Sequence, residues 1–69
     1  MSKLISLQDR DYGSFGWSQK NATIYPDGFV ILYEGVKLPE KDVQSDLITL
    51  NSDESRKLYE ELKEIFGNE

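Results

Sequence analysis

The chain has 69 residues, among them 13 acidic and 8 basic side chains, and a net charge of −5. A chain of this length supports only a thin core, so we expect residues 1–69 to form a single small domain. The sequence has no cysteine and no histidine. It therefore lacks disulfides, thiolate metal sites and the commonest general base, and we expect neither an enzyme nor a cofactor or metal. The acidic balance argues against direct binding to a nucleic-acid backbone, which attracts Lys and Arg.

The first residues are an ordinary mixture of polar and apolar types. They contain no long apolar run of the kind that forms a signal peptide or a membrane span. The absence of cysteine also suits a reducing compartment. We therefore expect a cytoplasmic protein that does not contact membranes.

The N-terminal third predicts two extended segments separated by a turn. Residues 4–7 alternate weakly between polar and apolar types, as a strand does. The polar stretch 8–13 ends in glycine and indicates a turn. If residues 14–18 are extended, Phe15 and Trp17 share a face, and an irregularity near residues 19–21 would interrupt the alternation.

The strongest local signal is a β-hairpin over residues 20–34. Pro26 presets the backbone angle of a type I turn, Asp27 can bond the local backbone, and Gly28 accepts the left-handed conformation that closes such a turn. A three-residue loop places Tyr25 opposite Phe29. The same register brings Lys20 and Glu34 together, and their opposite charges favour it.

Most residues on each face of this hairpin are apolar. One face carries Ile24, Val30, Ala22 and Leu32, with Lys20 and Glu34 at its end, and the other carries Tyr25, Phe29, Thr23, Ile31, Asn21 and Tyr33. A sheet that is covered on one side only alternates apolar with polar residues, which this hairpin does not do. We therefore expect both faces to be covered, or one to remain an exposed apolar patch.

The C-terminal half predicts one more strand and a helix. Residues 46–50 contain two β-branched residues and favour a strand that pairs with the hairpin or with the first strand. Asn51 with Glu54 resembles a capping box, and Gly67 is a typical helix stop. Between them, one apolar stripe follows helical spacing and consists of Leu58, Leu62, Ile65 and Phe66.

These elements predict an α+β fold, in which an antiparallel sheet of three to four strands carries the C-terminal helix on one face. We expect the helix on the face of Ala22, because that small side chain leaves room for it, and the face of Tyr25 is the alternative. The other face would then be a partner-binding surface of Tyr25, Phe29, Ile31, Tyr33 and Trp17. In the alternative, the N-terminal strand or a curled sheet covers these side chains within one chain.

The functional expectation is a small, acidic, non-catalytic module that binds protein. The sequence has neither a nucleophile elbow nor a glycine-rich phosphate loop. Size and class favour an inhibitor or adaptor of a larger protein, as phages and other mobile elements encode against host defence, anti-CRISPR proteins among them. One alternative is a homo-oligomer, such as a homodimer, that binds a small ligand or has a structural role. A second is a mimic of a polyanion, with an acidic surface of Glu60, Glu61 and Glu64.

Overall fold

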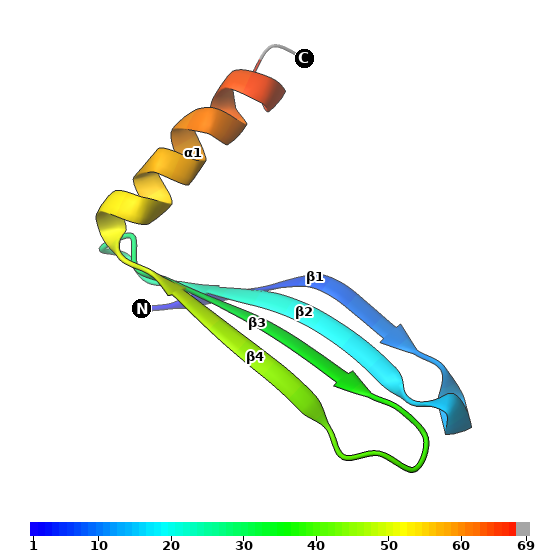
Figure 1. Cartoon of the computed structure of the whole chain (residues 1–69). Coiled ribbons are helices and arrows are strands. Elements are labelled where there is room, and N and C mark those ends of the chain that lie inside the picture. The colour runs from blue at the N-terminus through cyan, green and yellow to red at the C-terminus, as the bar shows by residue number, and fades with distance from the viewer. Residues whose placement is uncertain (68–69) are drawn as a thin grey trace.

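The computed structural model describes residues 1–67 and shows a four-stranded sheet followed by a helix (Figure 1). The elements are β1 (Lys3–Asp11), a 3₁₀ turn (Gly13–Phe15), β2 (Trp17–Ile24), β3 (Val30–Lys37), β4 (Gln44–Leu50) and α1 (Ser52–Phe66). All neighbouring strands are antiparallel, and their order in the sheet is their order in the chain. The α+β class, the antiparallel sheet and the C-terminal helix are therefore confirmed.

The predicted hairpin is present in the predicted register. Lys20 lies opposite Glu34 at one end of the β2–β3 pair. At the other end, the amide of Tyr25 donates to the carbonyl of Phe29 at 2.9 Å. The Asp27 carboxylate accepts from the amide of Phe29 at 3.0 Å, and Gly28 has a φ of 94°. Turn chemistry alone thus specifies the pairing of these two strands.

The predicted turn over residues 8–13 is wrong, because β1 continues to Asp11. The chain reverses later, where the amide of Tyr12 donates to the carbonyl of Gly16 at 2.8 Å. Gly16 has a φ of 110°, and a Cβ there would overlap the backbone carbonyl of Lys37. Glycine at position 16 therefore serves both the turn and a close approach between chain segments.

The expected shared face of Phe15 and Trp17 is also absent. Phe15 belongs to the 3₁₀ turn and is 72% exposed, whereas Trp17 begins β2 and is half-buried. The irregularity expected near residues 19–21 lies on the neighbouring strand instead. There the register between β1 and β2 shifts between Ser6 and Gln8, so Leu7 is the extra residue of a β-bulge.

Helix α1 begins as predicted. The side chain of Asn51 accepts from the amide of Glu54, and the carboxylate of Glu54 accepts from the amide of Asn51, both at 2.9 Å. The amide of Gly67 donates to the carbonyl of Lys63 at the other end. No helix within residues 1–67 has the length and apolar character needed to cross a membrane.

The position of α1 differs from the expectation that it lies on the Ala22 face. Figure 1 shows α1 leaving the end of the sheet and diverging from it, so that sheet and helix form an open V. Its first turn meets the β2–β3 turn, where the Ser55 hydroxyl donates to the carbonyl of Gly28. Only Asn51 separates β4 from α1, and this is shorter than most strand–helix connections.

The chain consequently has almost no interior. Among the described residues, Ala22 is the only buried hydrophobic side chain, with 6% of its surface exposed. The molecule measures 41 × 27 × 18 Å and has a radius of gyration of 14.9 Å. A compact domain of this length has a radius of gyration of about 11 Å. The structure therefore presents two open sheet faces and an open helix to its surroundings.

Candidate interaction surfaces

The first open surface is the sheet face that contains Ala22, here called the aliphatic face. Strand pairing places four apolar side chains side by side across the sheet: Ile5, Ala22, Leu32 and Ile48. Ile24, Val30 and Leu50 form a second row nearer the helix. Ile48 is 60% exposed, although it lies in the middle of a strand. A shallow hollow of about 610 Å³ opens on this face next to Leu7, Leu32 and Ile48.

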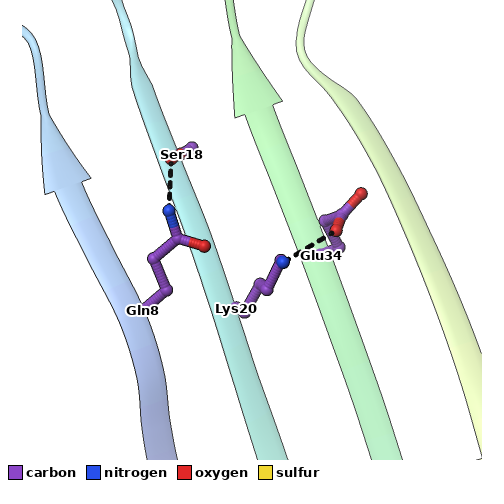
Figure 2. A network of polar contacts seen from close by, with 4 residues as sticks. All are labelled: Gln8, Ser18, Lys20 and Glu34. Atoms are coloured by element: carbon purple, nitrogen blue, oxygen red, sulfur yellow. Dashed lines mark hydrogen bonds and ion pairs between the residues drawn. The ribbon is translucent and has the colours of Figure 1, made fainter.

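Polar side chains border the same face towards the far end of the sheet. Figure 2 shows the Gln8 amide, which donates to the Ser18 hydroxyl at 3.3 Å. It also shows the Lys20 ammonium, whose Nζ lies 3.8 Å from Oε2 of Glu34. Hydrogen bonding from Ser18, and then from Arg10, lowers the pKa of the Tyr12 hydroxyl. Both members of the Lys20–Glu34 pair are more than half exposed, so water weakens their attraction.

The second open surface is the opposite sheet face, here called the aromatic face. Trp17, Ile31 and Tyr33 lie on it by alternation along β2 and β3, and all three are half-buried. The ring of Tyr33 covers Gly35, since a Cβ at that glycine would collide with the ring. At the end of the face, Tyr25 and Phe29 meet edge to face, with centroids 5.9 Å apart. The structure therefore brings the five predicted partner-binding residues to one side of the sheet or its margin.

Sequence reasoning missed two members of the aromatic face. Leu4 pairs with Thr23, and Leu47 pairs with Tyr33, so both lie on this side of the sheet. They are 70% and 65% exposed, which is more than any of the five predicted residues. Alternation along residues 46–50 groups Leu47 with Thr49, but only the pairing of β4 with β3 shows which face they join.

The third open surface is the apolar side of α1, here called the helix stripe. It consists of the predicted residues Leu58, Leu62, Ile65 and Phe66, with Tyr59 at its margin. Leu62 is 42% exposed and Ile65 is 65% exposed, and no residue of the helix is buried. A helix with a wide apolar stripe derives most of its stability from packing that stripe. The chain by itself offers the stripe no such packing.

The predicted acidic surface is part of a helix with mixed charge. Glu60, Glu61 and Glu64 are all exposed. Lys57 lies four residues before Glu61, and Arg56 lies four residues before Glu60, at the spacing of neighbouring side chains on a helix. The acids therefore alternate with bases along α1 rather than forming a field of one sign.

The described part of the chain holds no group of three or more His, Cys, Asp or Glu residues arranged to bind a metal ion. Its open surfaces are apolar and aromatic, with charges at their borders, and such surfaces are suited to contact with protein. Comparison of the chain with protein-family models, with curated protein sequences and with solved structures finds no match.

Proposed function

We propose that this protein is a non-catalytic binding module that acts as an inhibitor or adaptor on a larger protein, and that the aromatic face contacts the target. The absence of histidine and cysteine from the sequence supports a role without catalysis. Small size and a net charge of −5 favour an inhibitor of the type that phages and mobile elements direct against host defence in the cytoplasm.

The observation that carries this proposal is the exposure of the aromatic face. Leu47 presents most of its surface to solvent beside the half-buried ring of Tyr33, and Leu4 is similarly exposed on the same face. Tyr and Trp are enriched in protein interfaces, where they bury a large area and lose few rotamers. Monomeric proteins rarely leave an apolar patch of this kind uncovered.

The charges of this face indicate the chemistry of the target. Asp9 and Asp11 lie on the aromatic face near Trp17, and Lys37 pairs directly with Trp17. The acids outnumber the base, so the matching surface of the target is apolar with a basic border. Such a border would accelerate association and fix the orientation of the two proteins.

Affinity capture from a lysate of the host cell, followed by titration with the purified captured protein, tests this assignment. Leu47→Ser removes an exposed apolar side chain from the aromatic face, and we expect the affinity to fall about tenfold, as for an interface anchor. Thr49→Ser, two residues along on the same face, is the matched control and should change the affinity less than twofold. Equal affinities of wild type and Leu47→Ser would refute the assignment of this face.

A further inference from the structure

The exposed surface of the chain is too large for a compact monomer. A folded protein of 8.0 kDa has an accessible surface of about 4,450 Å². This chain exposes 5881 Å². The excess is about 1,400 Å² per chain, and two chains that buried it together would form an interface of the size found in obligate homodimers.

The helix stripe cannot be covered by the sheet of the same chain. Asn51 is the whole connection between β4 and α1, and its side chain is held in the capping box with Glu54. The hydrogen bond from Ser55 to the Gly28 carbonyl fixes the first turn against the hairpin. In this arrangement α1 lies on neither sheet face (Figure 1), so only an apolar surface from outside the described residues could cover its stripe.

Charge distinguishes the two sheet faces as possible surfaces for the stripe. Helix α1 carries more acids than bases: Asp53, Glu54, Glu60, Glu61 and Glu64 against Arg56, Lys57 and Lys63. The aliphatic face carries more bases than acids: Lys3, Arg10 and Lys20 against Glu34 and Asp46. The aromatic face is acidic on balance. The small excess of acids on α1 therefore favours the aliphatic face over the aromatic one.

Dimensions agree with this choice. A helix of 15 residues is about 22 Å long. A strand of 8 residues is about 26 Å long. One helix can thus cover most of the length of the aliphatic face. The hollow beside Leu32 and Ile48 offers space there for an aliphatic side chain such as Leu62.

From these observations we infer that the partner of both surfaces is a second copy of this chain. In a dimer with two-fold symmetry, α1 of each copy lies across the aliphatic face of the other, which is open because α1 diverges from its own sheet (Figure 1). This reciprocal packing of each helix on the other copy's sheet buries both helix stripes and both aliphatic faces. It leaves both aromatic faces free for the target of the proposed function.

The mass of the wild-type protein in solution is the first test. Analytical ultracentrifugation should give about 16 kDa, twice the chain mass of 8.0 kDa. The melting temperature should also rise with protein concentration, because a dimer is stabilised by mass action. A mass near 8 kDa at high concentration, with a constant melting temperature, would overturn the inference. It would leave the proposed function standing, since the Leu47→Ser titration tests a different face.

Cross-linking tests the arrangement of the two copies. The chain has no cysteine, so single cysteines can be introduced without background. Leu62→Cys on the helix stripe is mixed with a second chain that carries Ile48→Cys on the aliphatic face. A short bismaleimide is added, and the linked peptides are identified by mass spectrometry. Leu47→Cys is the matched control, because it adjoins Ile48, is similarly exposed and lies on the opposite face.

We expect Leu62→Cys to be linked to Ile48→Cys at least ten times more than to Leu47→Cys. Preferential linkage to Leu47→Cys would place the helix on the aromatic face and overturn the inference. Linkage of Leu62→Cys mainly to itself would indicate a dimer of paired helices, which also contradicts the packing of each helix on the other copy's sheet. Because Leu62 and Ile48 are 42% and 60% exposed in the single chain, neither substitution removes a buried side chain from its fold.

Discussion

Replacing Gly28 by alanine tests whether the hairpin turn positions the helix. Gly28 has a φ of 94°, and left-handed backbone costs a residue with a Cβ about 1–2 kcal/mol. A Cβ at position 28 would also lie 3.2 Å from Cβ of Ser52, so the first turn of α1 must shift. That shift strains the hydrogen bond from Ser55 to the Gly28 carbonyl, which contributes about 1 kcal/mol. The total expected loss is about 2–3 kcal/mol.

Gly13→Ala is the matched control for this substitution. Gly13 has a φ of 64°, and a Cβ there would meet nothing within 4 Å. Gly13→Ala therefore loses only the free energy that a left-handed backbone costs a residue with a Cβ, about 1 kcal/mol. Both variants are unfolded in urea and followed by circular dichroism and by the fluorescence of Trp17, the only tryptophan in the sequence. Equal losses of stability in the two variants would refute the idea that the turn supports the helix.

Three further substitutions have defined outcomes. Asn51→Ala removes the capping box and should cost about 0.5–2 kcal/mol in urea unfolding, with reduced helical circular dichroism; an unchanged helix would show that the cap is unimportant. Lys20→Ala breaks an exposed pair with Glu34 and should change stability by less than about 1 kcal/mol. Tyr33→Ser uncovers Gly35 and should cost about 1 kcal/mol in thermal unfolding as well as weakening target capture; a loss of capture at unchanged stability would mean that the ring serves the interface alone.

The parts of the fold that were predicted correctly are those with local causes. Pro26, Asp27 and Gly28 specify a turn whose length sets the register of β2 against β3, so every pair down to Lys20 and Glu34 follows. The Asn51 cap likewise depends on groups three residues apart. Such interactions join residues that are close in the sequence, so they do not depend on how distant segments fold.

The parts that were missed depend on distant segments. The turn at Gly16 lies against the backbone of Lys37, which is the last residue of β3 and distant in the sequence. The position of α1 could not be read from its apolar stripe, because a stripe shows that a helix needs an apolar partner but does not say which chain supplies it. Alternation along β3 places Ile31 and Tyr33 on one face, and Trp17 joins them because β2 pairs with β3 without a break, whereas Leu47 required the pairing of β4 with β3.

The meander topology has a consequence for how the protein reaches its folded state. Each strand pairs with its neighbour in sequence, through connections that close between Asp11 and Trp17, Ile24 and Val30, and Lys37 and Gln44. Closing short loops loses little chain entropy, and proteins dominated by such local contacts fold rapidly. The sheet can therefore form as soon as its last strand is available, before any contact with a second chain. In the proposed dimer, the slow step of assembly is then the encounter of two preformed sheets, and its rate should increase with protein concentration.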